Sequence, residues 1–298
     1  MQGTGRWGRN LVRALTKTEG IVVDWIVDPD SEARRTATSI APKARTAANV
    51  AETGFDFDAA VVATPALDHV PHVQSLLVHD KHVLVEKPAA MRRADAEAMT
   101  HHATARGLVL MAGHQLCFHP VFARLEQAVR EGLIGTVRHV RSVRTGPVDF
   151  TKEPGVLWSY GPHDASMLLT LYQDVPRRSE VSILRSTNGV PLEAELRLTF
   201  ETDGDAEIYL CGLPDKKERR LTVRGDRGIL EFDDAIPGGR LLYTDETGTA
   251  RPIEVPASPD ALLLECIHFA ECIRTDARPR TGGSHLTDVT RIVRMWMD

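Results

Sequence analysis

The first third of the chain alternates short apolar runs with polar, alanine-rich stretches of helical length. Apolar runs lie at residues 21–27, 58–64, 82–87 and 107–113, and residues 92–105 have the length and polarity of a surface helix. Near-continuous β-branched runs that alternate with helices are typical of a parallel sheet covered on both faces. The pattern therefore predicts an α/β domain built as a doubly wound parallel sheet.

The period of the pattern changes near residue 113. After a helical stretch at 121–131, apolar and polar residues alternate with a period of two at 137–143, 193–200, 206–212, 220–225 and 228–232. This alternation predicts an open antiparallel sheet with one face in water. Residues 235–256 are expected to form a loop and a hairpin. We therefore expect two domains, 1–112 and 113–298, the second of the α+β class.

A glycine motif stands at the very start of the chain. Gly3, Gly5 and Gly8 in "GTGRWG" have the G-x-G-x-x-G spacing that lets a tight turn, a pyrophosphate and a helix N-terminus meet. Asp28 follows twenty residues later, where a carboxylate can bind a ribose diol and repel a 2′-phosphate. The motif predicts a dinucleotide site that prefers NAD to NADP, with Arg6 and Trp7 inside it. A glycine turn with a capping aspartate is the alternative.

The strand that should precede this motif is missing, because only Met1 and Gln2 come before Gly3. A central strand buries roughly five apolar side chains at ~1.5–3 kcal/mol each. This sum is comparable to the whole net stability of a domain, ~5–15 kcal/mol. The end of the chain, "DVTRIVRMWMD", also stops inside a helical pattern. We therefore expect the natural chain to be slightly longer, and a native mass of 32.9 kDa would contradict this.

The stretch "LVEKPAAM" ends an apolar run with Glu86, Lys87 and Pro88. A charged pair at the end of a buried strand is costly unless it is paired or used. The carboxyl end of a parallel strand is where ligands bind in open α/β sheets. On spacing alone, a structural ion pair and a catalytic lysine explain this stretch equally well.

Composition excludes several classes of function. The net charge of −5 provides no basic surface for nucleic acid, and no apolar run approaches the length of a membrane span. The four cysteines lack C-x-x-C spacing and the N-terminus lacks an apolar signal region. We expect reduced thiols in a cytoplasmic protein, and the spacing of His, Asp and Glu predicts no metal site.

Five motifs in register resemble the Gfo/Idh/MocA oxidoreductase family. They are the glycine motif, "ATP" at 63–65, "EKP" at 86–88, "GHQLCFHP" and "LWSYGPHD". The later stretch "LPDKKERRLTVRGDRGILEFDD" is most similar to nucleotide-sugar members of the UDP-N-acetylglucosamine 3-dehydrogenase type. The resemblance implies an NAD(P)-binding Rossmann domain and a second domain that carries the substrate site and an oligomer interface, in a homodimer or homotetramer.

The resemblance also assigns roles to individual residues. It implies that Lys87 contacts the reacting hydroxyl and helps to move its proton, and that Thr64 and Pro65 line the nicotinamide half of the cofactor. Glu86 would orient or neutralise Lys87. His163 would act as acid/base or hydroxyl ligand, a role that suits a side chain titrating near neutral pH.

The remaining substrate contacts are His114, Ser159 and Asp164. Many members of the family carry Asp four residues before the histidine, and here that position is Ser159, so Asp164 is expected to compensate or Lys87 to carry more of the chemistry. Capping of a helix N-terminus is the alternative role for His163 and Asp164. A satisfied core histidine is as good an explanation of His114.

Other polar residues have weaker claims on function. His69 and His72 lie near the expected cofactor entrance, and His101 and His102 look like surface helix residues. The series Arg138, Arg141 and Arg144 could bind a diphosphate, but a solvated strand face is the favoured interpretation. Loop residues 145–154 are expected to set specificity.

Three functions agree with these patterns. The first is a dehydrogenase that oxidises a ring hydroxyl of a sugar, cyclitol or nucleotide sugar by hydride transfer to the nicotinamide. The second is a regulatory protein that binds NAD or a sugar without turnover, which Ser159 and the missing strand favour slightly. The third is a redox-neutral lyase or hydrolase that recycles its NAD.

Overall fold

The computed structural model describes residues 1–150, 154–202 and 204–297, and the chain divides into two compact units. The first unit contains Met1–Gln115 and Ala261–Thr290, and the second contains Leu116–Asp260 and the chain from Arg291 onward. The first boundary lies three residues after the expected one. Residues 261–290 were expected in the second domain, but they pack with the first unit.

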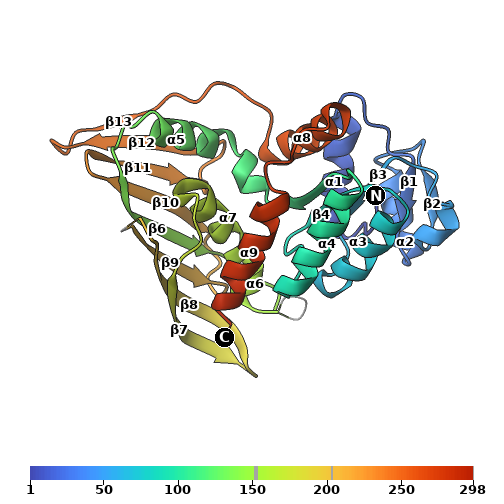
Figure 1. Ribbon diagram of the computed structural model, residues 1–298, viewed down its shortest axis with the longest axis horizontal. Coiled ribbons are helices and arrows are strands. Elements are labelled where there is room, and N and C mark those ends of the chain that lie inside the picture. Colours follow the sequence, from blue (N-terminus) through green and yellow to red (C-terminus); the bar gives the residue numbers. More distant parts are fainter. Residues whose placement is uncertain (151–153, 203, 298) are drawn as a thin grey trace. The chain divides into compact units, whose positions relative to one another are not determined.

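The first unit is built on parallel strands (Figure 1). These are β1 (Trp25–Val27), β2 (Arg45–Ala47), β3 (Ala59–Val62), β4 (His82–Glu86) and β5 (Leu110–Gly113). β1 pairs with β2, and β3, β4 and β5 pair in that order, each pair parallel. The connections carry α1 (Arg6–Lys17), α2 (Ser31–Thr38), α3 (His69–Val78), α4 (Arg93–Ala105) and the short 3₁₀ helices η1 (Val50–Thr53) and η2 (Ala66–Asp68). The predicted parallel sheet is confirmed.

A stub of two residues occupies the place of the missing strand. Gln2 forms isolated parallel bridges to both Val27 and Val62. Its N–H donates to the Val61 carbonyl at 2.8 Å, and its own carbonyl accepts from Ala63 at 2.8 Å. Gln2 therefore joins the β1–β2 pair to the three-stranded part of the sheet, and the glycine motif leaves the sheet from the position that the fold requires.

The C-terminal segment covers the first unit in two places. Helix α8 (Ala261–Thr275) packs on α1. Ahead of α9 (Gly283–Met295), Thr281 donates its hydroxyl to the Ala112 carbonyl at 2.7 Å and accepts the Ala112 N–H at 3.0 Å. An edge strand has unpaired backbone groups, and Thr281 pairs with both backbone groups of Ala112 in β5. This pairing and the packing of α8 on α1 hold residues 261–290 against the first unit.

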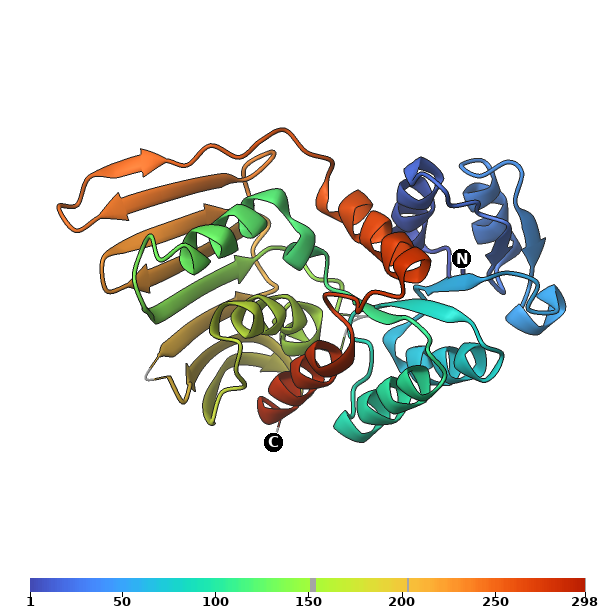
Figure 2. The same cartoon turned by 45° about the horizontal axis from the view of Figure 1, so that its top comes forward.

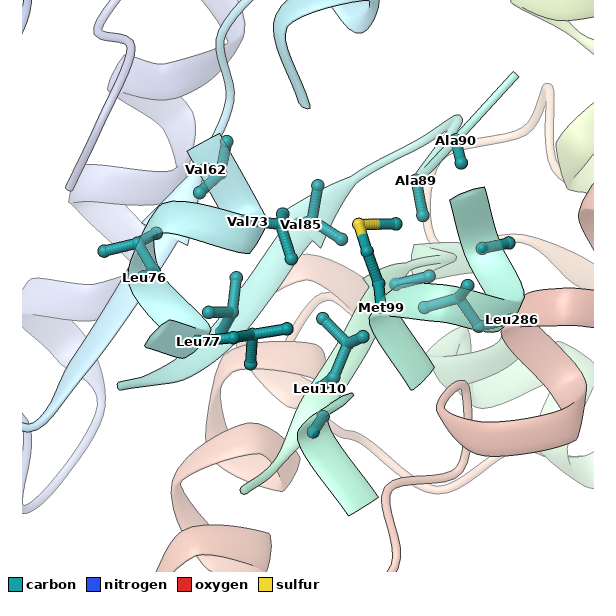
Figure 3. Packing of buried hydrophobic residues seen from close by; sticks show 14 of the residues in the cluster. Val62, Val73, Leu76, Leu77, Val85, Ala89, Ala90, Met99, Leu110 and Leu286 are labelled. Atoms are coloured by element: carbon teal, nitrogen blue, oxygen red, sulfur yellow. The ribbon is translucent and has the colours of Figure 1, made fainter. Parts of the chain in front are cut away.

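The core of the first unit lies between the sheet and the helices α3 and α4. Figure 3 shows Val62 and Val85 from the strands packed against Val73, Leu77 and other side chains of these helices, with Leu286 of α9 in the same cluster. All of these side chains are fully or almost fully buried. The core holds the strand ends, and therefore the loops that follow them, in fixed register.

The second unit carries an eight-stranded sheet covered on one face (Figure 2). Its strands are β6 (Val137–Thr145), β7 (Arg178–Thr187), β8 (Val190–Thr199), β9 (Asp205–Cys211), β10 (Glu218–Gly225), β11 (Gly228–Asp233), β12 (Arg240–Asp245) and β13 (Ala250–Pro252). Their order is β13-β12-β11-β10-β6-β9-β8-β7, and every pair is antiparallel except β6 with β9. The predicted strands are confirmed, and so is the hairpin within 235–256, whereas β7 and the short β2 were not predicted.

Helices cover the apolar face of this sheet. They are α5 (Pro120–Arg130), α6 (Val156–Ser159) and α7 (Gly161–Tyr172), and the 3₁₀ helix η3 (Gln115–Phe118) precedes them. Along β8, the buried residues Ala194, Leu196 and Leu198 alternate with exposed Glu195 and Arg197. The period of two thus places apolar side chains under the helices and charged ones on the open face, as the sequence predicted.

Candidate functional site

The loops that leave the parallel strands carry most of the predicted site residues. Gly3 follows the Gln2 stub and Asp28 follows β1, while Thr64 lies two residues after β3. Lys87 follows β4 directly, and His114 follows β5. Because these strands are parallel, the loops leave the sheet at one edge, which is where open α/β sheets bind ligands.

The three glycines of the motif differ in how much room a side chain would have at each position. Gly3 has φ +83°, and a Cβ there would lie 2.6 Å from the backbone of Ala63 and Thr64. A Cβ on Gly8 would lie 2.1 Å from the Gly3 carbonyl oxygen. A Cβ on Gly5 would meet nothing within 4 Å. Packing requires the first and third glycines, while the space over Gly5 stays open.

That open space lies over the start of α1. Gly5 is the N-cap residue, and no side chain caps the helix. Arg6 and Trp7 in the first turn are exposed, and no acidic residue lies there. The first N–H groups of a helix are uncompensated donors at the positive end of its dipole. This cradle fits a pyrophosphate, so the residues present are suited to hold a dinucleotide.

Asp28 is held in place by the glycine loop. Its Oδ2 accepts hydrogen bonds from the backbone N–H of Thr4 at 2.6 Å and from the Thr4 hydroxyl at 3.0 Å. Its Oδ1 accepts the N–H of Asp30 at 3.0 Å. The side chain is only partly buried, so an oriented carboxylate stands where the sequence predicted a ribose ligand.

Glu86 is the buried last residue of β4. Its Oε1 accepts the indole N–H of Trp7, and its Oε2 accepts the backbone N–H of Lys87 at 3.1 Å. Burial raises the pKa of Glu86, against the opposing effects of Trp7 and Lys87. Glu86 thus links the glycine motif to the backbone of Lys87, which is half-buried and precedes a cis bond to Pro88.

Glu265 lies buried in the first unit, and the sequence analysis did not single it out. This residue of α8 is fully buried, and among the described residues neither of its carboxyl oxygens has a hydrogen-bond partner. Burial raises its pKa well above the usual range, and the nearby Glu86 carboxylate raises it further. Burial at this place therefore favours the neutral form of the Glu265 carboxyl group. The sequence does contain a signal for this burial, because Glu265 is the single acidic residue within the apolar run "ALLLECIHFA".

His114 is a buried neutral imidazole close to Lys87. Burial lowers its pKa well below the usual range, and His285 and Lys87 lower it further. The His285 ring of α9 lies 5.8 Å from it, and its own pKa is lowered by burial to about 4. Within the described chain, Nδ1 of His114 has no hydrogen-bond partner. The sequence analysis did not single out His285.

Thr64 and Pro65 leave β3 beside the glycine loop. The Thr64 backbone lies close to Gly3, and its hydroxyl oxygen is buried with no hydrogen-bond partner in the described residues. Pro65 is exposed. A buried hydroxyl without a partner is rare in a finished core, so its place at this edge is consistent with a ligand contact.

The three other predicted residues belong to the second unit. His163 lies half-buried in the first turn of α7, and Ser159 is buried at the end of α6. The Ser159 hydroxyl donates to the Gly155 carbonyl at 2.8 Å. Neither His163 nor Asp164 caps α7, whose N-cap is Tyr160 without a side-chain hydrogen bond. The capping alternative is therefore wrong.

Asp164 forms a buried ion pair with Arg144. It is 0% exposed and accepts hydrogen bonds from the Ser142 hydroxyl at 2.6 Å and from Arg144 Nε at 3.0 Å. Its expected contact with substrate stays a prediction, but both of its oxygens already have partners in this structure. Two arginines of β6 do fit the expected solvated face: Arg141 is exposed, and exposed Arg138 pairs with Asp226. For Arg144 that interpretation is wrong, because the strand turns it under α7.

The structure describes only part of the loop expected to set specificity, since residues 151–153 lie outside the described residues. In the described ranges no group of His, Cys, Asp and Glu could hold a metal ion. There, too, each helix is too short or too polar to cross a membrane. All four cysteines are buried and form no disulfide.

Two family models match this chain. One describes the NAD-binding Rossmann fold of the oxidoreductase family and matches residues 1–114, and the other describes the family's C-terminal domain and matches residues 122–231. The chain belongs to the Gfo/Idh/MocA family. The resemblance read from the five motifs is therefore confirmed, together with an NAD-binding Rossmann domain.

Several relatives place the chain within the Gfo/Idh/MocA family. The dTDP-3,4-didehydro-2,6-dideoxy-α-D-glucose 3-reductase of Streptomyces violaceoruber is 32% identical over 83% of this chain and 79% of the relative. The 2,7-anhydro-N-acetylneuraminate hydratase of Mediterraneibacter gnavus is 28% identical over 52% of this chain and 41% of its own. Matches to the first three curated relatives span between 28% and 42% of those proteins. UDP-N-acetylglucosamine 3-dehydrogenase from Acidithiobacillus ferrooxidans shares the fold, with a TM-score of 0.88, 19% identity and coverage of 98% and 93%.

Proposed function

We propose that this protein is an NAD-dependent dehydrogenase that oxidises a ring hydroxyl of a sugar, cyclitol or nucleotide sugar. The observation that carries the proposal is the position of Lys87. It follows β4 at the ligand-binding edge of the sheet, and Trp7 of the glycine motif is hydrogen-bonded to the residue before it. A proton acceptor therefore lies next to the loop that fits the cofactor.

The chemistry needs two acceptors at one carbon. A bound nicotinamide supplies the hydride acceptor, so that the alcohol becomes a ketone and NAD⁺ becomes NADH. Lys87 takes the hydroxyl proton as the C=O bond forms, and it must be a neutral amine to do so. His114, a neutral imidazole, can donate or accept one hydrogen bond at the hydroxyl. The role of His163 in proton transfer rests on the family resemblance.

The substrate class rests on the relatives. The Streptomyces violaceoruber relative is named for a reaction on a nucleotide-linked sugar, and its similarity covers most of both chains. This supports a nucleotide sugar over a free sugar. The open face of the second unit's sheet supports a dimer or tetramer, since such a face is usually covered.

A redox-neutral reaction with recycled NAD is the second candidate. The Mediterraneibacter gnavus relative carries the name of a hydratase, a reaction without net oxidation. A regulatory protein without turnover is a third candidate, which Ser159 favours. Mixing the NAD-loaded protein with a panel of nucleotide sugars separates the three. NADH that accumulates in proportion to product supports the dehydrogenase, product without NADH supports the hydratase type, and tightly bound NAD with no exchange supports the regulator.

Replacing Gly5 with alanine is expected to weaken cofactor binding without harming the fold. The added methyl meets nothing within 4 Å, so the free energy of unfolding should stay the same or rise by up to about 1 kcal/mol. NADH affinity, measured by tryptophan fluorescence, should fall about tenfold because the methyl fills the space over the helix N–H groups.

Gly8→Ala is the contrast to this variant. Its methyl would lie 2.1 Å from the Gly3 carbonyl oxygen, so we expect a loss of about 1–3 kcal/mol of stability. Undiminished NADH binding by Gly5→Ala would show that the phosphates do not lie over α1.

Replacing Asp28 with alanine should change the preference between the two nicotinamide cofactors. Loss of the carboxylate removes a ribose ligand and the charge that repels a 2′-phosphate. NADH should bind about tenfold more weakly, while NADPH should bind no more weakly than to the wild type. Titration of both cofactors measures the ratio. Asp30→Ala is the matched control, because this exposed neighbour only caps α2. Equal ratios in both variants would contradict the assignment.

A further inference from the structure

His69 connects two loops of the candidate site through its two ring nitrogens. It begins α3 and is 1% exposed. Its Nε2 lies 2.8 Å from the Thr64 carbonyl oxygen, and its Nδ1 lies 2.8 Å from the Pro88 carbonyl oxygen. Thr64 follows β3 and Pro88 follows Lys87, so one imidazole spans the ends of two neighbouring strands.

Both partners of this ring are acceptors. A carbonyl oxygen cannot donate a hydrogen bond, and a neutral imidazole has only one N–H. A neutral His69 would satisfy one carbonyl and place a ring lone pair against the other at 2.8 Å. A doubly protonated ring donates to both, and each bond is then a charge-assisted one.

The pKa of His69 is lowered on balance. Burial lowers it most, and the nearby Lys87 and His72 lower it further, while the bonds to Pro88 and Thr64 raise it. The two carbonyl oxygens at 2.8 Å oppose this shift, because only a ring with two N–H groups can donate to both of them.

His72, one turn further along α3, makes a different contact with a single partner. Its Nδ1 accepts the side-chain N–H of Gln2 at 2.8 Å. Gln2 precedes the glycine motif, so α3 is tied to the stub as well as to the loops after β3 and β4. No backbone hydrogen bond within the sheet can perform this function, because the strands have already ended where these loops begin.

We propose that His69 is a positioning residue whose doubly protonated ring holds the Thr64 and Pro88 carbonyls and thereby fixes the spacing between the nicotinamide loop and Lys87. The role in catalysis rests on the proposed function, but the bridge itself does not. A misplacement of about 1 Å at a reacting group can lower the rate on the order of 10²-fold. Loss of the bridge should therefore act on turnover more strongly than on folding.

The first test is nuclear magnetic resonance on the wild-type protein at neutral pH, without cofactor. The His69 ring, assigned through bonds in uniformly labelled protein, should show two protonated nitrogens. A neutral tautomer of His69 overturns the doubly protonated bridge. This measurement needs no variant and no activity.

The second test is kinetic and uses His69→Gln and His69→Phe, with His101→Gln as the control. A glutamine amide carries both N–H groups on one nitrogen and cannot reach carbonyls on opposite sides. Both variants should lower kcat about 10- to 100-fold, with a smaller change in the KM for NAD, while the control stays at wild-type values. Unchanged kcat in both variants overturns the positioning role. If the wild type itself binds no NADH, the proposed function fails, and the resonance experiment still decides the bridge.

Discussion

Lys87→Met is expected to abolish turnover while leaving the cofactor site intact. Methionine keeps the length and apolar stem of lysine but cannot accept a proton. General acid–base catalysis contributes about 10²–10⁴-fold, so kcat should fall by that factor. NADH affinity should change by less than about threefold, because the glycine loop and Asp28 are untouched. Steady-state kinetics on a responding nucleotide sugar and a fluorescence titration measure the two effects separately.

Lys87→Arg distinguishes proton transfer from simple charge. Arginine keeps the positive charge and hydrogen-bond donors, but it does not deprotonate in proteins. If Lys87 accepts the proton, Lys87→Arg should be as inactive as Lys87→Met. Substantial activity in the arginine variant would show that the residue only binds the substrate through its charge.

Lys81→Met is the matched control for these variants. Lys81 directly precedes β4, at the end opposite Lys87, and its ammonium lies 5.6 Å from the centre of the Phe57 ring. It is remote from the edge that carries the glycine loop. Its variant should keep wild-type kcat, and equal losses in both lysine variants would indicate a general effect on the fold.

The sequence predicted the well-buried strands and missed two edge strands that bury few side chains. β3 and β4 are buried along most of their length, and their apolar runs are therefore unambiguous. β2 and β7 lie at the edges of their sheets and bury few side chains. An edge strand is half solvated and need not show a continuous apolar run. The hydrophobic pattern thus reflects the burial of side chains, and it does not reveal a strand that buries few of them.

The sequence analysis also failed to predict which charged residues are buried inside the protein. Arg144 and Asp164 are twenty positions apart, and each alone is typical of a surface. Their partnership arises because α7 packs on β6, which no local pattern reveals. The motifs, by contrast, placed Lys87 and the glycines correctly at the sheet edge, because a strand end and a tight turn are local features.

The histidines show the same limit. His69 and His72 follow "ATP" and were assigned a place near the cofactor, but spacing could not show that one ring reaches two carbonyls. One of these, Pro88, lies nineteen residues away. Its position depends on the pairing of β3 with β4, so the bridge becomes visible only once the sheet is assembled.

Asp164→Asn is expected to cause the largest loss of stability among these variants. Arg144 is 5% exposed and Asp164 is fully buried. Burial opposes the charge on Arg144, but the Asp164 carboxylate outweighs it and the net effect raises the arginine's pKa. Removing one partner leaves a buried charge without its counter-ion, which costs about 3–5 kcal/mol. Urea unfolding should show this loss against a typical total of ~5–15 kcal/mol.

Two further variants complete the experiment. Arg138→Gln breaks the ion pair between Arg138 of β6 and Asp226. Both partners are about half exposed, so the free energy of unfolding should fall by less than about 1 kcal/mol. The double variant Arg144→Met with Asp164→Leu removes both buried charges and should recover most of the loss, because apolar replacements of a buried pair are often neutral or stabilising. If Asp164→Asn costs no more than Arg138→Gln, the pair is not a structural support of α7 on β6. Asp164 would then be available for the substrate contact that the family resemblance implies.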